Sequence, residues 1–182
     1  SSGRSRTVFR IAPVVANGDQ GLAQLRNISD GGVKLRTSLP ISSGDRIHIM
    51  LSPSYSLEGH VIWTDGDECG IEFIEPIDSE RALRESHAES HAPGARAPRF
   101  AAAGSAIVET EHGAYKVELC DVSQGGMKVA HDGALTPEAK VRVTLPSGAR
   151  RHGVVRWSMD GLAGIMLMEK FSVNDLGQIS KL

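Results

Sequence analysis

Hydrophobic and polar residues alternate along most of this chain, a pattern typical of strands that bury one face. Val33–Thr37 and Ile47–Leu51 show the alternation most clearly. Turn residues such as those of Asn17–Gly21 and Asp65–Asp67 separate the apolar stretches. The pattern predicts six short strands in the first part of the chain, at residues 11–16, 22–26, 33–37, 47–51, 57–64 and 69–74. Strands at this spacing favour a closed barrel or a sandwich.

The same pattern occurs twice. The stretch Arg26–Leu35 returns in altered form as Cys120–Val129, and the two align without a gap at an offset of 94 positions. A repeat this long indicates a duplicated domain, because solenoid repeats are roughly 20–50 residues long. Trp63 and Trp157 match at this offset, and we expect both to pack in the core or at a barrel rim. The second set of strands is predicted near residues 105–110, 115–121, 126–130, 140–145, 152–158 and 163–168.

The chain is therefore expected to be an all-β protein of two tandem six-stranded antiparallel barrels. We assign residues 1–78 to the first barrel, 79–98 to a linker and 99–182 to the second barrel. The linker contains good helix formers with only a thin apolar face, so it is a short surface helix or an irregular connection. Any helix must end soon after His91, because a proline and a glycine follow. Ser172–Leu176 is a candidate start for a short C-terminal helix, capped by Ser172 or Asn174.

Composition disfavours several classes of function. The net charge is −2 and aromatic residues make up 4%, whereas a nucleic-acid-binding barrel needs a basic face with stacking aromatics. The two cysteines, Cys69 and Cys120, have no cysteine at the repeat offset, so we expect buried, inert thiols in a reduced, cytoplasmic protein. No apolar run is long enough to span a membrane, and no catalytic arrangement is recognisable. His87 and His91 have a metal-like spacing without a third ligand, so no metal is expected.

Two groups of residues carry candidate chemistry. Arg6 and Arg10 form Arg-x-x-x-Arg just before the first predicted strand, and guanidinium groups suit phosphate oxygens or guanine O6 and N7. Asn27, Ser29 and Gly32 form Asn-x-Ser-x-x-Gly at the end of the second strand. The asparagine carbonyl can accept from a guanine edge, and serine can donate or accept. The glycine, with the one before it, permits positive φ and close approach of a ligand. Together these groups suit an anionic, guanine-bearing ligand.

The two groups in this order, followed by a strand ending in Gly70–Phe73, resemble the PilZ family of receptors for the bacterial second messenger cyclic di-GMP. The resemblance covers residues 4–75 well and about 100–168 less completely. It implies a six-stranded barrel whose flexible arginine segment closes over the dinucleotide. Arg6 and Arg10 would contact phosphate and the guanine Hoogsteen edges, with Arg4 as an accessory contact. Asn27 and Ser29 would hold a second guanine face, and Gly32 would shape the turn. The interval from Arg10 to Asn27 is a few residues shorter than is usual in the family.

The second copy departs further from the family pattern. It keeps Asp121, Ser123 and Gly126, but the positions matching Arg6 and Arg10 are Phe100 and Gly104. Arg96 and Arg99 lie just upstream with a different spacing, so these two arginines with Asp121, Ser123 and Gly126 form only a possible second site. We favour a degenerate copy that sets dimer contacts or the geometry of the first.

The resulting hypothesis is a non-catalytic cytoplasmic receptor for cyclic di-GMP that needs no cofactor. Ligand binding would order the N-terminal segment and signal to an unidentified effector protein. A homodimer is a further candidate assembly, and no nucleic acid or membrane partner is expected. One alternative is a PilZ-like protein–protein interaction module that binds no ligand. A second is a β-barrel that binds nucleic acid.

Overall fold

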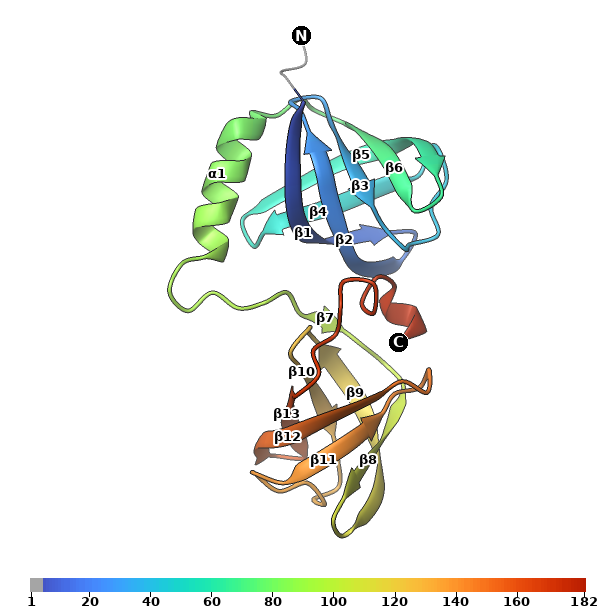
Figure 1. Cartoon of the computed structure of the whole chain (residues 1–182), viewed down its shortest axis with the longest axis vertical. Coiled ribbons are helices and arrows are strands. Elements are labelled where there is room, and N and C mark those ends of the chain that lie inside the picture. The colour runs from blue at the N-terminus through green and yellow to red at the C-terminus, as the bar shows by residue number, and fades with distance from the viewer. Residues whose placement is uncertain (1–4) are drawn as a thin grey trace. The chain divides into compact units, whose positions relative to one another are not determined.

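The computed structural model describes residues 5–182, and the chain divides into two compact units between residues 96 and 97. Both units consist mainly of antiparallel strands, and one helix precedes the boundary (Figure 1). The prediction of an all-β protein with two tandem barrels is confirmed. Arg4 lies outside the described residues. Among residues 5–182, no helix combines the length and the apolar character that a bilayer crossing requires.

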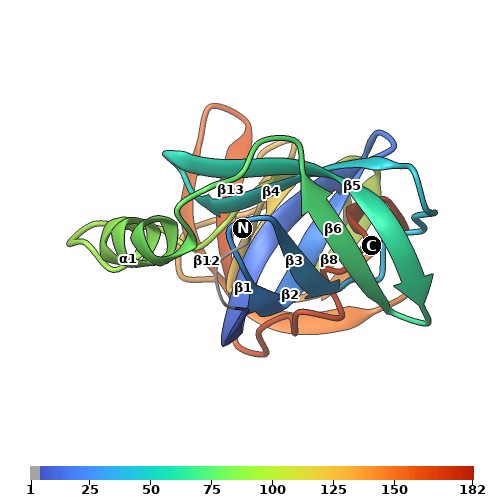
Figure 2. The same cartoon turned by 90° about the horizontal axis from the view of Figure 1, so that it is seen from above.

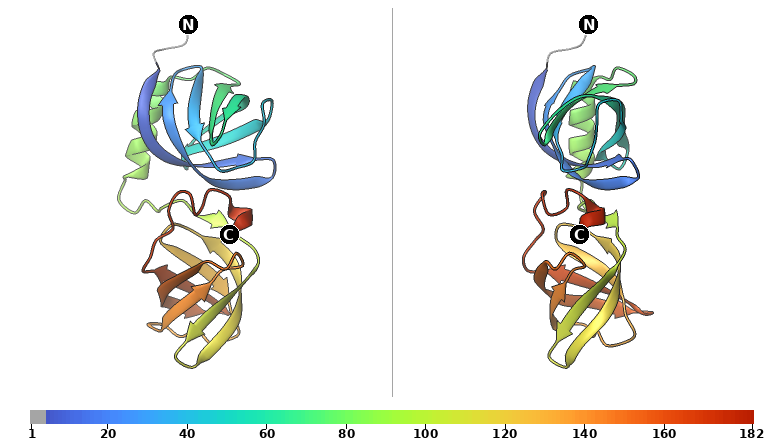
Figure 3. Two further views of the ribbon diagram at one scale, coloured as in Figure 1. Left: turned by 45° about the vertical axis from the view of Figure 1, so that its right-hand side comes forward. Right: turned by 90° about the vertical axis from the view of Figure 1, so that its right-hand side faces the viewer.

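The first unit is a closed six-stranded barrel in the order β1-β2-β3-β6-β5-β4. Its ring of strands is visible in the right-hand view of Figure 3. Closure comes from β1 and β4, which pair through Val14 with Ile49. A closed ring leaves no unpaired strand edge, which matters for a domain this small. The strands are β1 (Arg6–Ala16), β2 (Asp19–Ile28), β3 (Gly32–Arg36), β4 (Arg46–Ser52), β5 (Tyr55–Asp65) and β6 (Glu68–Phe73).

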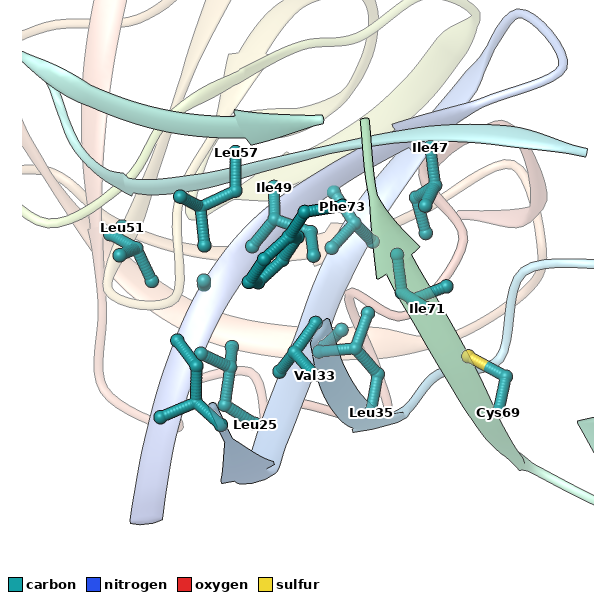
Figure 4. Close-up of a cluster of buried hydrophobic side chains, with 14 of the residues drawn as sticks. Leu25, Val33, Leu35, Ile47, Ile49, Leu51, Leu57, Cys69, Ile71 and Phe73 are labelled. Atoms are coloured by element: carbon teal, nitrogen blue, oxygen red, sulfur yellow. The ribbon is translucent and has the colours of Figure 1, made fainter. Parts of the chain in front are cut away.

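Alternate residues of these strands point inward and form the core (Figure 4). Leu25, Leu35, Ile47 and Ile49 are fully buried, and Cys69 is almost so. Burial raises the pKa of the Cys69 thiol to about 11. The expectation that both cysteines are buried was wrong for Cys120. This residue lies at a bulge of the second barrel and is half-buried.

β1 begins earlier than predicted. We expected the arginine pair, Arg6 and Arg10, to precede the first strand, but both lie within β1. The alternation was hidden because a bulge interrupts the β1–β2 ladder between Thr7 and Arg10. The segment that the family resemblance describes as flexible is therefore paired with β2 in this structure.

Helix α1 (Ser79–Ser90) lies across one end of the first barrel (Figures 1 and 3). Asp78 caps its N-terminus by accepting a hydrogen bond from the Arg81 N–H. Ala82 joins the barrel core, and Ser79 and Ser86 are buried beside it. The region assigned to a linker therefore starts with a helix that packs on the first barrel, also visible from above in Figure 2.

The second unit closes in the same way, through β10-β13-β12-β11-β8-β9 with an additional β9–β10 pairing. A short extra strand, β7, was not predicted and pairs with β9. β7 and β8 together correspond to β1, with a break at residues 102–104. The strands are β7 (Phe100–Ala101), β8 (Ser105–Thr110), β9 (Gly113–Val122), β10 (Gly126–Ala130), β11 (Lys140–Thr144), β12 (Arg150–Met159) and β13 (Leu162–Leu167).

The expected C-terminal α-helix does not form at Ser172–Leu176. The Asp175 N–H donates to Ser172 Oγ at 3.0 Å, which closes a single turn. Gly177 follows this turn, and glycine disfavours continuation of a helix. A short 3₁₀ helix, η1 (Ile179–Lys181), comes after it instead.

Candidate functional site

The turn between β2 and β3, residues 27–32, is called here the Asn-Ser-Gly turn. The Ser29 N–H donates to the Gly32 carbonyl at 2.9 Å, and Ser29 Oγ donates to the same oxygen at 3.4 Å. The second copy repeats this closure, with Ser123 and Gly126 at 2.8 and 3.4 Å. In both copies the serine therefore holds the turn in shape.

Gly32 is needed for space, not for an unusual φ. We expected Gly31 and Gly32 to permit positive φ, but neither residue is in that region. A Cβ at Gly32 would collide with the carbonyl oxygen of Ile71 on β6. The same holds less severely at Gly126, where a Cβ would lie 2.9 Å from the carbonyl oxygen of Ile165. The glycine thus lets the turn sit tightly against the neighbouring strand.

Arg6 lies beside the Asn-Ser-Gly turn because of the β1–β2 register. Arg6 is the Cα partner of Ile28, and Thr7 is the partner of Asn27. The Arg6 guanidinium forms an ion pair of 3.0 Å with Glu80 of α1. The Arg6 and Glu80 side chains are 46% and 63% exposed, so this pair is solvated and easily exchanged for another anion.

Arg10 points to a different place. Its guanidinium donates to the Leu51 carbonyl of β4 at 2.9 Å and to the Leu83 carbonyl of α1 at 3.3 Å. Burial lowers the pKa of Arg10, a group that nonetheless stays charged. The structure therefore brings Arg6, but not the Arg10 guanidinium, to the Asn-Ser-Gly turn.

The outer face beside the turn carries polar groups from β2 and β3. Asn27 is half-buried, and among residues 5–182 its side chain makes no hydrogen bond. Its partner in β3 is Lys34, which forms an ion pair of 2.9 Å with Glu68. The Asn27 amide is thus open to an incoming donor or acceptor.

Trp63 lies at the rim of this face and not in the core. Its indole covers Gly70, where a Cβ would collide with the ring, and the side chain is 40% exposed. Trp157 covers Gly164 in the same way, so the arrangement is common to both copies.

Two residues that sequence reasoning missed connect the site to α1. Asp30, within the Asn-Ser-Gly turn, accepts hydrogen bonds from Ser79 Oγ at 2.7 Å and from the Ser79 N–H at 3.0 Å. These bonds lower the pKa of the Asp30 carboxyl. Glu80 is the other residue, as the partner of Arg6. Neither contact has a local signal in the sequence, because the partners lie 49 and 74 positions apart.

In the second copy, two cations of the same barrel pair with the Asp121 carboxylate. Arg99 donates to Asp121 Oδ1 at 2.9 Å, and Lys128 lies 3.3 Å from Oδ2 of the same carboxylate. Phe100, at the position of Arg6, is buried, and Gly104 replaces Arg10. Of the residues predicted for a possible second site, Arg99 contacts Asp121 at the turn that Ser123 and Gly126 close. Arg96 is exposed in the coil after α1.

Groups outside this site offer little further chemistry. The rings of His87 and His91 stack with centroids 4.0 Å apart, and His91 Nδ1 contacts the His87 carbonyl at the end of α1. Among residues 5–182, no cluster of three or more histidine, cysteine or acidic residues has the arrangement of a metal site.

Comparison with known proteins identifies the family. The model of the PilZ domain matches two segments, residues 4–88 and 95–182. No curated protein matches the sequence.

Several solved structures are similar over most of the chain. The PlzA protein of Borreliella burgdorferi in complex with c-di-GMP is 14% identical, with a TM-score of 0.41 and coverage of 96% of this chain and 94% of that one. The inhibitor of motility of Bacillus subtilis (MotI/DgrA) is 10% identical, with a TM-score of 0.38 and coverage of 93% and 91%. YcgR of Escherichia coli in complex with c-di-GMP is 12% identical, with a TM-score of 0.34 and coverage of 87% and 75%. Because these TM-scores are low, the family assignment rests on the two domain matches.

Proposed function

Because the chain belongs to the PilZ domain family, with two tandem copies, we propose that its first barrel is a non-catalytic receptor for cyclic di-GMP. The observation that carries this proposal is the β1–β2 register, which pairs Arg6 with Ile28 and Thr7 with Asn27. Residues far apart in the sequence, one cationic and one able to read a guanine edge, thereby lie on adjacent rungs of the same ladder. A cyclic dinucleotide needs both, since it presents phosphates and guanine bases together.

Each residue has a proposed role. Arg6 binds phosphate, and Arg10 joins it after leaving its carbonyl partners. Asn27 offers an unused amide to the edge of a guanine. Ser29 and Gly32 contribute indirectly, since they hold the turn that carries Asn27.

We propose a mechanism other than closure of a mobile arginine segment. In this structure α1 contacts both arginines, through Glu80 and through the Leu83 carbonyl. The Arg10 guanidinium also donates to the Leu51 carbonyl of β4. The ligand must therefore compete with α1 for these two side chains. A ligand can shift such an equilibrium only by its differential affinity for the two states.

Release of α1 is energetically accessible. The buried residues on its barrel-facing side are Ser79, Ala82 and Ser86, which contribute little apolar area. Leu83 is partly buried against the barrel core, and the Ser54 N–H donates a hydrogen bond to Glu89. A 12-residue helix is also marginal in water once it is detached. We infer that α1 is the element through which binding is signalled to an effector.

Glu80→Gln tests this competition. The change removes the anion that holds Arg6, so the variant should bind cyclic di-GMP more tightly, by up to about fivefold. Glu85→Gln is the matched control, because Glu85 lies on the same helix and pairs with Arg81 instead. Affinities are compared by calorimetric titration. Equal affinities of the two variants would exclude competition by Glu80.

The function itself is tested by calorimetric titration of the purified chain with cyclic di-GMP, with GTP, cyclic GMP and an unrelated oligonucleotide as controls. Selective binding of cyclic di-GMP at micromolar concentration or below is the expected result. Binding of oligonucleotides with a steep salt dependence would replace the proposal by a nucleic-acid-binding barrel. No heat with any ligand would favour a protein–protein interaction module.

A further inference from the structure

Phe9, between the two arginines, is the most exposed large apolar side chain among residues 5–182, at 73%. Scattered exposed apolar residues are normal in soluble proteins, so exposure alone implies nothing. However, the Arg26 guanidinium lies over the Phe9 ring, 5.6 Å from its centroid. Arg26 directly precedes Asn27, so this pair borders the proposed ligand site.

Two bulges turn these residues outward at the same place. In the β1–β2 ladder, Val8 and Phe9 together oppose Arg26, because the register shifts between Thr7 and Arg10. Arg26 is also the extra residue in the β2–β3 ladder. Bulges redirect side chains and are over-represented next to functional sites.

The second copy provides an internal comparison. At the repeat offset Phe9 corresponds to Ala103 and Arg26 to Cys120. The bulge itself is retained there, since Cys120 is the extra residue between Asp121 and Leu119. The copy that lacks the arginine pair therefore also lacks the aromatic ring and the cation beside it, although it keeps the bulge at Cys120.

We propose that Phe9 and Arg26 form a stacking platform for one guanine base of the ligand, an inference that rests on the proposed function. An aromatic ring offers a base a flat apolar surface, and a guanidinium plane stacks on either partner. The ring is open to solvent on the side that Arg26 does not cover. The platform adds base stacking to the phosphate and edge contacts of Arg6 and Asn27.

Phe9→Ala should weaken cyclic di-GMP binding by about five- to hundredfold, the range observed for loss of one base–aromatic stack. Ile62→Ala is the matched control, because Ile62 is a comparably exposed apolar residue (52%) on β5. Both positions are exposed, so neither change should affect folding. Phe9→Trp should keep the affinity, and cyclic di-GMP should quench its fluorescence beyond any change in the wild type, which carries only Trp63 and Trp157.

The outcomes separate the two proposals. If the wild type does not bind cyclic di-GMP, the proposed function fails and the platform fails with it. If the wild type binds, but Phe9→Ala matches Ile62→Ala and Phe9→Trp shows no additional quenching, only the platform is overturned. Weakened binding of Phe9→Ala together with quenching of Phe9→Trp supports the platform.

Discussion

At the scale of single residues, Gly32 has a structural role that differs from the expected one. Gly32 follows a serine in a turn-forming stretch, so conformational freedom was the natural interpretation. The actual constraint is the Ile71 carbonyl, which belongs to a strand 39 positions further along the chain. Close approach between distant strands leaves no local pattern, and this is why the sequence could not reveal it.

Gly32→Ala should lower the stability of the first barrel by about 1–3 kcal/mol, because the added Cβ forces β3 away from β6. Urea unfolding followed by the fluorescence of Trp63, in a Trp157→Phe background, measures this barrel alone. The control is Gly125→Ala, followed through Trp157 in a Trp63→Phe background. A Cβ at Gly125 meets only Lys170 Cε, at 3.9 Å. Equal losses in the two variants would contradict the steric explanation.

The two thiols should differ in reactivity. The pKa of Cys69 is raised from 9.0 to about 11 by burial, whereas Cys120 is only half-buried. Ellman's reagent at pH 8 should therefore modify one thiol in the folded chain and both in denaturant, and a Cys120→Ser variant should show no fast reaction. Because the folded Cys69 thiol keeps its proton while the unfolded one ionises, stability should fall as the pH rises from 9 towards 11. Rapid labelling of Cys69 in the folded chain would refute the assignment.

At the scale of elements, alternation predicted the barrel strands because each buries one face against the core. The prediction was less successful where that condition fails. The first residues of β1 bulge away from the ladder, and β7 is only two residues long. α1 was recognised only as a possible surface helix, since its buried residues are small or polar and Leu83 is its one large apolar residue against the barrel. The contacts that hold it join distant segments and have no sequence signature.

Asp78→Ala should loosen α1 without disturbing the barrel. Loss of an N-cap costs about 0.5–2 kcal/mol, a large share of the stability of a weakly packed helix. Hydrogen exchange should therefore accelerate at the amides of residues 79–90 and remain unchanged in β1–β6. Arg84→Ala, at an exposed position of the same helix, serves as the control. Unchanged exchange in α1 would show that its packing on the barrel, and not its cap, determines its stability.

At the scale of the whole molecule, the repeat offset alone established two barrels of the same kind. It also located the positions where the copies differ, namely Phe100 and Gly104 in place of the arginine pair. What it could not reveal is that Arg99 and Lys128 already neutralise Asp121. A carboxylate held by two cations within one barrel is poorly suited to receive a ligand. We therefore propose that the first copy alone binds the ligand.

Calorimetric titration of Arg6→Ala, Arg99→Ala and the wild type with cyclic di-GMP tests whether the ligand binds at the first barrel. Arg6 forms an exposed ion pair with Glu80, so its removal should leave the fold intact. Arg6→Ala should weaken binding at least about tenfold, the cost of one charged hydrogen bond, while Arg99→Ala should keep the affinity and stoichiometry of the wild type. Wild-type affinity of Arg6→Ala, or loss of binding in Arg99→Ala, would contradict a ligand site at the first barrel.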